Sequence, residues 1–323
     1  MPDEPQPSRR GRWRIVLQFG VSALAVWLIA RQVDFRESGH LIAGARTGYV
    51  LGAIVLYVAG QMLSAYRWRL IGVSVGLADS YAHYVRYYFI GMFFMFFGPS
   101  TLGGDLVRSL YLAESAGSRS KAFNSVLFDR LNGLVVLVTI GAGAFLVFPE
   151  YRRLAPEFYV VFYVTVAFGT SLFLGWWLAP WLVRLLFARE HRIRQLVEND
   201  LGPFWSNRRM LIATAGVSFV FHFIQIAAQY LISRALGLAV PFAYICIFHP
   251  LVSSVAAIPI SLSGLGVREK TYMYFLQQLG VSQSAGLAYG ALWLVVIVVN
   301  SLLGGLVFVA TGARLPRLRR AAA

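Results

Sequence analysis

The chain has 323 residues, of which 58% are hydrophobic and only 13% are charged. Soluble domains carry roughly 25% charged residues, so this composition excludes an ordinary soluble domain and predicts a polytopic membrane protein. A net charge of +15 would indicate a nucleic-acid partner for a soluble protein. Here the basic residues flank apolar runs, where they set orientation in a membrane. We therefore expect no nucleic-acid partner.

Metal and nucleophile chemistry find little support in the sequence. The single cysteine, Cys246, excludes an internal disulfide and a cysteine-based metal cluster. The five histidines lack a metal-ligand spacing such as HExxH, and no nucleotide-binding loop is present. We expect no metal, no cofactor and no catalytic residue, and hence a protein that is not an enzyme.

Six segments are long and apolar enough to cross a hydrocarbon core of about 30 Å, which needs about 20 helical residues. In chain order they are 14–32, 48–66, 124–148, 158–180, 211–233 and 285–310. The first follows the basic stretch RRGRWR, as the apolar part of a signal peptide would, but it is long and no convincing cleavage site follows. We expect it to remain as an uncleaved helix.

The loop charges predict the orientation of these helices. The N-terminal stretch, the RWR at 67–69, the segment 181–210 and the C-terminal tail are basic, whereas 33–46 and 149–157 are nearly balanced. Positive charge favours the cytoplasmic side, so both termini should be cytoplasmic in a bacterial inner membrane. The basic loop 181–210 either only sets topology or also lies along an anionic lipid surface.

Two further apolar regions, 83–104 and 243–266, lie between spans whose facing ends are on the same side of the membrane. Each region must therefore enter and leave on one side: the cytoplasmic side for 83–104 and the external side for 243–266. Each ends in a related decamer. PSTLGGDLVR at 99–108 and PISLSGLGVR at 259–268 share Pro, Leu, Gly, Val and Arg at five equivalent positions. A chance match in so Gly- and Leu-rich a chain is the alternative explanation. Broken helices of opposite entry side are typical of inverted-repeat transporters, whose substrate site lies where the repeats meet.

The predicted fold is therefore all-α and integral to the membrane, with about six full spans and two re-entrant broken hairpins in inverted pseudo-symmetry. We expect one membrane domain over 1–323, with the first hairpin at 83–108 and the second at 243–270. If the decamers are symmetry mates, Gly104 and Gly264 should lie near one another at the centre of the protein.

Charged residues near the hydrophobic region are costly and indicate a functional site. Guanidinium groups bind phosphate, nearby carboxylates order them or pair with a cationic headgroup, and glycines before a helix start expose N–H groups to an anion. The candidate headgroup-binding residues are Arg108, Arg268, Asp105, Glu269, Gly103, Gly104, Gly264, Gly266, Asp129 and Arg130. An ordinary interfacial ion pair explains Asp129 and Arg130 about as well, and a position next to the external interface explains Arg268 and Glu269 equally well.

Three motifs carry a resemblance to a known family. LGGDLVR at 102–108, FDRLNGL at 128–134 and PISLSGLGVREK at 259–270 resemble the flippase-like membrane domain of lysylphosphatidylglycerol synthases. The resemblance covers nearly the whole chain and implies lipid translocation by the membrane part. The full-length synthases continue into a soluble aminoacyltransferase domain. Here RLPRLRRAAA follows the last span, so we expect that this chain does not aminoacylate lipid.

The leading hypothesis is movement of a phospholipid or a polyprenyl-phosphate-linked lipid between leaflets, with its headgroup passing between the two hairpins. One alternative is a membrane enzyme acting on a lipid carrier, for which His83 and His249 are available near the hairpins. Another is a non-transporting scaffold for a separate lipid-modifying enzyme. Arg108 and Arg268 would be replaceable in a scaffold and essential in a translocator.

Overall fold

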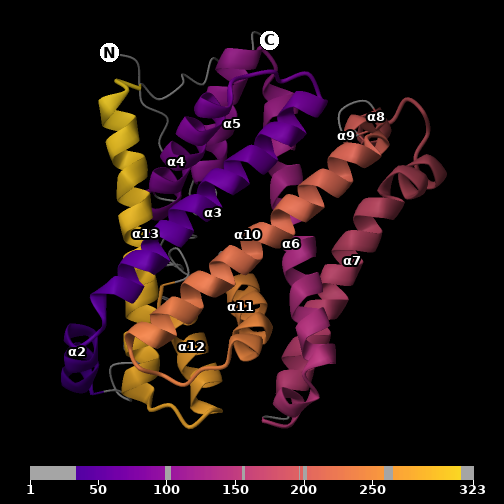
Figure 1. Cartoon of the computed structure of the whole chain (residues 1–323). Coiled ribbons are helices and arrows are strands. Elements are labelled where there is room, and N and C mark those ends of the chain that lie inside the picture. The colour runs from indigo at the N-terminus through magenta and orange to yellow at the C-terminus, as the bar shows by residue number, and fades with distance from the viewer. Residues whose placement is uncertain are drawn as a thin grey trace, which may run out of the picture.

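The computed structural model describes residues 34–98, 103–154, 157–195, 197–198, 202–257 and 265–313, and no strand occurs among them. Four helices in this part of the chain are long and apolar enough to cross a membrane: α3 (Thr47–Ser74), α6 (Arg119–Val147), α10 (Arg208–Ala235) and α13 (Gln283–Ala310). Three of them contain the predicted spans 48–66, 211–233 and 285–310, and α6 covers the predicted span 124–148 except for its last residue. The predicted first span, 14–32, lies outside the described residues. The described part of the chain is thus all-α (Figure 1), and its four helices of spanning length indicate a multi-pass membrane protein.

Another long helix, α7 (Glu157–Leu186), covers the predicted span 158–180 and continues beyond it. It packs beside α6 and α11 at the right of Figure 1. A short 3-10 helix, η1 (Pro149–Arg153), joins α6 to α7. Before the first described long helix lies α2 (Phe35–Ala43), whose N-terminus is capped by the Asp34 side chain. The cap satisfies backbone N–H groups that have no partner within the helix.

Each region predicted as a hairpin overlaps two short helices, the second of which continues beyond the predicted end. The first pair is α4 (Tyr81–Phe97) and α5 (Gly103–Ala116), and the second is α11 (Phe242–Ala257) and α12 (Val267–Gln277). The interruption falls within or next to the related decamers, although Pro99, Pro259 and Gly264 lie outside the described residues. The predicted approach of Gly104 to Gly264 therefore stays a prediction.

Close backbone contact joins α4 to α5. A Cβ built on Gly104 would collide with the carbonyl oxygen of Gly91 and lie 2.7 Å from the Met95 Cβ. Only glycine at this position lets the two helices approach so closely. A similar close contact at a glycine joins α13 to α4, because a Cβ on Gly304 would collide with the Phe89 carbonyl. These contacts place α5, which carries Asp105 and Arg108, against the interior of the bundle.

We expect Gly104→Ala to destabilise the protein by about 1–3 kcal/mol, because the new methyl group forces α4 and α5 apart. Gly143→Ala on α6 is the matched control, since nothing lies within 4 Å of its added Cβ. The control should be neutral or stabilising by up to about 1 kcal/mol, as expected for glycine replaced within a helix. Thermal denaturation in detergent measures both. Equal melting temperatures for the two variants would contradict the close-contact explanation.

The buried side chains form two main clusters, one around each short-helix pair. The first includes Val75, just after the end of α3, Leu112 of α5 and Phe128 of α6. The second includes Val240 and Phe248 from the segment around α11, with α12 and α13 packed on it. In Figure 1 the α4–α5 pair lies near the top and the α11–α12 pair near the bottom. The molecule therefore has a packed layer at each end.

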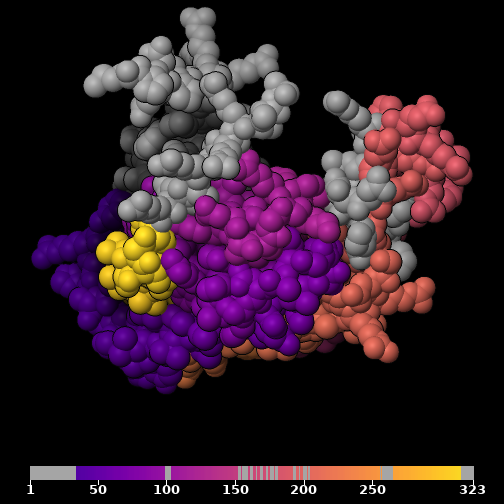
Figure 2. All heavy atoms as spheres, turned by 90° about the horizontal axis from the view of Figure 1, so that it is seen from above, coloured from indigo at the N-terminus to yellow at the C-terminus, as the bar shows by residue number. Residues whose placement is uncertain are grey.

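The basic segment 181–210, predicted as a loop, holds ordered structure. The end of α7, α8 (Arg192–Gln195), α9 (Gly202–Ser206) and the start of α10 occupy much of it. Glu198 forms ion pairs with two arginines: its Oε1 lies 3.0 Å from Arg184 Nε and 3.2 Å from Arg194 Nε. Phe204 is fully buried and stacks on Phe128, with ring centroids 5.0 Å apart. From above, residues near 190 project to one side of the bundle (Figure 2).

Candidate functional site

A cavity of about 400 Å³ lies inside the helix bundle, between the two short-helix pairs. Arg108 of α5 and Arg268 of α12 both line it, although 160 positions separate them in the chain. Tyr57 and Gln61 of α3 form another part of the wall. Two charged groups from distant parts of the sequence thus face a common space.

Arg108 is held on all sides. It is 5% exposed, its Nε donates to Asp105 at 3.1 Å and its Nη1 donates to Asp129 at 3.1 Å. The guanidinium carbon lies 4.9 Å from the ring centroids of both Trp68 and Tyr88. Cation–π contacts of this kind stabilise a cation more strongly as water is removed. The arginine is therefore kept charged and fixed in orientation at the cavity wall.

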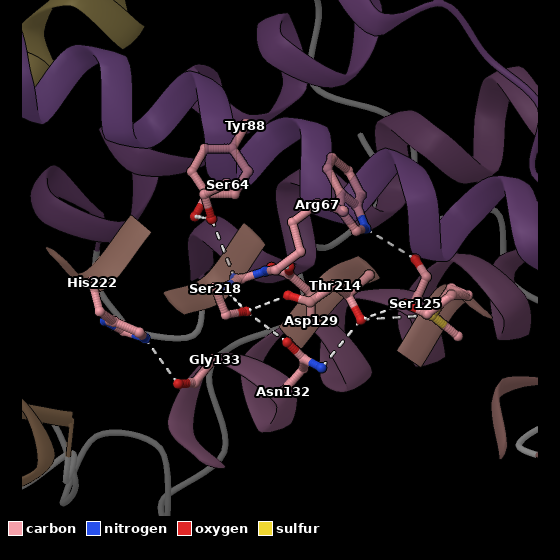
Figure 3. A network of polar contacts seen from close by, with 12 residues as sticks. Ser64, Arg67, Tyr88, Ser125, Asp129, Asn132, Gly133, Thr214, Ser218 and His222 are labelled. Atoms are coloured by element: carbon pink, nitrogen blue, oxygen red, sulfur yellow. Dashed lines mark hydrogen bonds and ion pairs between the residues drawn. The ribbon is translucent and has the colours of Figure 1, made fainter. Parts of the chain in front are cut away.

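Asp129 is the centre of the ionic network and is 1% exposed. Besides Arg108 it accepts a hydrogen bond from Arg67 Nε at 2.7 Å. Arg67 also donates to Ser218 of α10 at 2.9 Å and to Ser64 of α3 at 3.2 Å (Figure 3). One carboxylate therefore connects α3, α5 and α6, and Arg67 extends the network to α10.

Arg130 pairs with Asp105 rather than with its neighbour Asp129. Successive residues on a helix point in different directions, about 100° apart, so adjacent charges on α6 do not face one another. Asp129 and Arg130 therefore do not pair with each other, as the sequence allowed. Instead, Asp129 pairs with Arg108 and Arg130 pairs with Asp105, and both pairs link α5 to α6. Both residues line the cavity, and the Arg130 side chain is 41% exposed.

Arg268 and Glu269 are buried and bonded to each other. Glu269 Oε1 accepts from Arg268 Nη2 at 2.7 Å, and its Oε2 accepts from the Gly266 N–H at 2.7 Å. Gly266 has φ +80°, in the left-handed region that glycine adopts without strain. The Gly266 N–H, which the sequence suggested as a donor to a bound anion, therefore donates to the Glu269 carboxylate instead. The same carboxylate orients Arg268.

Gly103 and Gly104, which were expected to precede a helix start, instead lie inside α5. The helix begins at Gly103, so Asp105 lies in its first turn rather than at its start. Gly104 lines the cavity and serves the close contact with Gly91. Gly103 contributes the first helical residue. An acidic residue in this turn is favoured by the positive end of the helix dipole.

The two histidines offered for an enzyme lie in different places. His83 is on the outer part of α4, and its Nδ1 lies 2.6 Å from Asp79. Partial burial raises the pKa of the Asp79 carboxyl, but hydrogen bonds from His83, Ser115 and the Ser80 N–H outweigh it and hold that pKa below its ordinary value. His249 instead lines the central cavity. The pair therefore does not converge on one site.

Four residues in and around the cavity belong to a polar stripe that sequence reasoning missed. They are Arg67, Ser218, His222 and Gln225. His222 Nε2 lies 2.9 Å from the Gly133 carbonyl oxygen, and Ser218 donates to Asn132 at 2.6 Å (Figure 3). Residues 218, 222 and 225 follow helical spacing on α10, so they share one face. That face points at the ionic network.

The charges of this region do not cancel. Four guanidinium groups, from Arg67, Arg108, Arg130 and Arg268, meet three carboxylates, from Asp105, Asp129 and Glu269. With all of these ionised, one positive charge is in excess. The three buried guanidinium groups balance the three carboxylates, so the excess charge is carried by Arg130, whose side chain is 41% exposed at the open edge of the cavity. A positive charge at this edge favours an anion. Among the described residues, no cluster of three or more His, Cys, Asp or Glu side chains could hold a metal ion.

The long apolar helices and the charged interior cavity define a multi-pass membrane protein with a buried polar site. The chain belongs to the family described as the lysylphosphatidylglycerol synthase TM region, whose model matches residues 15–304. This match confirms the family resemblance carried by the three sequence motifs.

Two relatives are described as UPF0104 membrane proteins. One, from Methanothermobacter thermautotrophicus, is 27% identical over 301 residues, which cover 85% of this chain and 88% of that protein. The other, from Pyrococcus horikoshii, is 22% identical over 294 residues, covering 82% and 88%. Both similarities extend over most of the membrane region, so they support a shared membrane architecture.

Proposed function

We propose that this protein moves a phospholipid or a polyprenyl-phosphate-linked lipid between the leaflets of a membrane. The observation that carries the proposal is the meeting of Arg108 and Arg268 at one cavity with a single excess positive charge. A lipid phosphodiester carries one negative charge and matches that excess. Its oxygens suit the forked donors of guanidinium groups.

In this mechanism the headgroup enters the cavity while the acyl chains stay in the surrounding lipid. The phosphate contacts Arg108 and Arg268, and Asp105 and Glu269 keep these side chains in place through the bonds described above. Of the four glycines near the helix starts, Gly103 and Gly104 lie in the first turn of α5 and Gly266 caps α12, while Gly264 lies outside the described residues. The phosphate can be released again because both arginines are already partly neutralised by carboxylates, which limits the strength of binding.

The proposal includes a topology. The α4–α5 and α11–α12 pairs are re-entrant hairpins of opposite entry side, both termini are cytoplasmic, and the membrane is the bacterial inner membrane. The separate packed layers around the two pairs support this arrangement. The basic segment 181–210 would lie on the anionic cytoplasmic surface. A separate lipid-modifying enzyme would supply or consume the translocated lipid.

Single-cysteine labelling in a Cys246→Ser background tests the topology. Cysteines at the exposed positions Ala78 and Ser115 should both react from the cytoplasmic side, and those at Ala239 and Ser282 both from the external side. A membrane-impermeant maleimide labels external cysteines in intact cells and cytoplasmic cysteines in inverted vesicles. If either pair reacts from opposite sides, that short-helix pair crosses the membrane and the inverted repeat is excluded.

Reconstitution into liposomes tests the function. With phospholipids labelled on an acyl chain with a fluorophore, dithionite bleaches only the outer leaflet unless the protein brings inner-leaflet lipid out. We expect the purified protein to render the inner-leaflet label accessible. Absence of movement for every phosphate-bearing lipid tried would reject translocation and leave the scaffold and enzyme hypotheses.

A further inference from the structure

A second cavity, of about 350 Å³, lies between α2, the turn that follows it and the end of α10. It shares no lining residue with the central cavity, and in Figure 1 α2 and the adjoining end of α10 lie at the lower left. Its walls include Glu37 and His40 of α2 and Arg46, which directly precedes α3. Small-molecule sites have volumes of about 300–1,000 Å³. The cavity is therefore large enough for a ligand of its own.

The polar side chains of this second cavity are unpaired. Glu37, His40 and Arg46 are exposed, and their side chains form no ion pair or hydrogen bond with another residue in the part of the chain that the structure describes. Glu37 and Arg46 carry opposite charges and line the same space, yet they do not pair with each other. Their charges are therefore free to contact a ligand.

Backbone hydrogen bonds hold the two charges on separate walls. The Arg46 N–H donates to the Ala235 carbonyl at 2.9 Å, which ties the turn after α2 to the end of α10. On α2 itself, the Ser38 hydroxyl donates to the Ser284 carbonyl at the start of α13 at 3.0 Å. Because both segments are attached to other helices, Glu37 and Arg46 face the cavity from fixed and different directions.

Two helices also end at this cavity. α2 ends at Ala43 and α10 ends at Ala235, and the residues that follow them, Gly44 and Leu236, lie in the wall. The C-terminal end of a helix carries a partial negative charge on its carbonyl groups. These carbonyl ends and the Glu37 carboxylate favour a cationic group, whereas Arg46 favours an anionic one.

The balance of these charges selects the class of ligand. With His40 uncharged, Glu37 and Arg46 cancel. A simple anion would gain from Arg46 but be repelled by Glu37 and the helix ends, and a simple cation would meet the opposite combination. A zwitterion, which carries an ammonium group and an acidic group a few bonds apart, gains at both walls without leaving a net charge.

We propose that the second cavity binds a small zwitterion, with its ammonium group at Glu37 and its acidic group at Arg46. The guanidinium fork suits a phosphate or a carboxylate, and the His40 imidazole can donate a further hydrogen bond to it. Leu41 and Leu236 give the cavity an apolar wall for the connecting carbon atoms. In the topology proposed above this site faces the external side, and it does not depend on lipid translocation through the central cavity.

Binding of small phosphodiesters to the full-length protein in detergent, measured by ligand-observed NMR, tests the site. The informative pair is glycerophosphoethanolamine and glycerophosphopropanol, which differ only in that a terminal ammonium group in the first is a methyl group in the second. Short-chain phosphatidylethanolamine carries the same zwitterion with acyl chains. Tighter binding of this lipid than of the chainless diester would identify a lipid headgroup as the ligand, and equal binding would identify a free zwitterion.

We expect glycerophosphoethanolamine to bind roughly 3–10-fold more tightly than glycerophosphopropanol, as for one hydrogen-bonded ion pair in a partly exposed site. Glu37→Gln removes the carboxylate at equal length and should abolish this preference. Arg46→Gln removes the guanidinium fork and should weaken the binding of both diesters severalfold. Glu150→Gln and Arg36→Gln, at exposed positions that do not line the cavity, are the matched controls and should bind both diesters as the original protein does.

Arg108→Gln separates this site from the central cavity. Because Arg108 does not line the second cavity, this variant should keep the full preference for the ammonium-bearing diester. Equal binding of the two diesters by the original protein, or binding of neither, would overturn the proposal. A preference that survives Glu37→Gln, or one that disappears in Arg108→Gln, would overturn it as well. None of these results depends on whether the protein translocates lipid.

Discussion

Replacing Arg108 by glutamine should abolish most lipid translocation while the protein still inserts and accumulates, because Arg67 and Arg130 still pair with Asp129 and Asp105. Arg268→Gln should likewise abolish most translocation, and because it removes the ion pair of buried Glu269, a lower yield of folded protein is expected for it. Each substitution removes charge-assisted hydrogen bonds to the phosphate, worth about 1.5–3 kcal/mol each. One lost bond weakens binding by roughly ten- to a hundredfold. Lysine at the same position keeps the charge but loses the fork, so it should retain partial activity. Rates in the liposome assay, normalised to reconstituted protein, measure the effect.

Matched arginine variants guard against a general effect of lost charge. Arg36→Gln changes an exposed arginine on α2, outside the cavity, and Arg314→Gln changes the basic C-terminal tail, where Arg317, Arg319 and Arg320 share its role in orientation. Both should translocate at close to the original rate. Wild-type rates in both Arg108→Gln and Arg268→Gln would end the phosphate-binding account and favour the scaffold hypothesis.

Asp129→Asn should be among the most destabilising single substitutions in the chain. Its carboxylate is shared by Arg67 and Arg108, all three residues being at least nine-tenths buried. Removing one partner leaves buried guanidinium charge uncompensated, which costs about 3–5 kcal/mol. We expect a large fall in melting temperature or in the amount of folded protein, measured by fluorescence-detected size exclusion after heating.

A second variant separates charge balance from local packing. Arg67→Met combined with Asp129→Asn removes one charge of each sign, so the double variant should be more stable than Asp129→Asn alone. Asp34→Asn, at the exposed cap of α2, should cost no more than about 1 kcal/mol. If Asp129→Asn melts within the range of that control, the buried network does not stabilise the fold as described.

The long helices could be predicted because spanning length and hydrophobicity are local properties of the chain. The segments 48–66 and 211–233 each lie inside a single observed helix, α3 and α10. The ordered structure at 181–210 could not be predicted in the same way. Helices as short as α8 and α9 are not stable alone, and they depend on contacts such as Phe204 on Phe128 that only the folded chain provides.

Arg67 has a buried role that loop-charge reasoning did not predict. Within RWR at 67–69 it counted as an orientation signal, yet its side chain is buried and bonded to Asp129, whereas Arg69 donates to the Asp79 carbonyl near the helix end. The missed signal was periodicity. Gln61 and Ser64 precede Arg67 at intervals of three on α3, so a polar face runs through the apolar helix.

The glycines illustrate a second limit of sequence reasoning. A glycine before a helix start is compatible with anion binding, with close packing and with a left-handed cap. Gly104 serves close packing against Gly91, and the N–H of Gly266 is bonded to Glu269. Distinguishing these roles requires the positions of neighbouring backbone atoms, which arise from tertiary contacts.

The central claim is that Arg108 and Arg268 contact the same phosphate, and a double-mutant cycle tests it most directly. Binding of phosphatidylpropanol, which offers phosphate without hydroxyl groups, would be measured for the original protein, Arg108→Gln, Arg268→Gln and the double variant. Residues that share a ligand group couple by about 0.5–3 kcal/mol, so the double variant should lose clearly less binding energy than the sum of the single losses. Losses that add within about 0.3–0.5 kcal/mol would place the two arginines at independent sites and contradict the account.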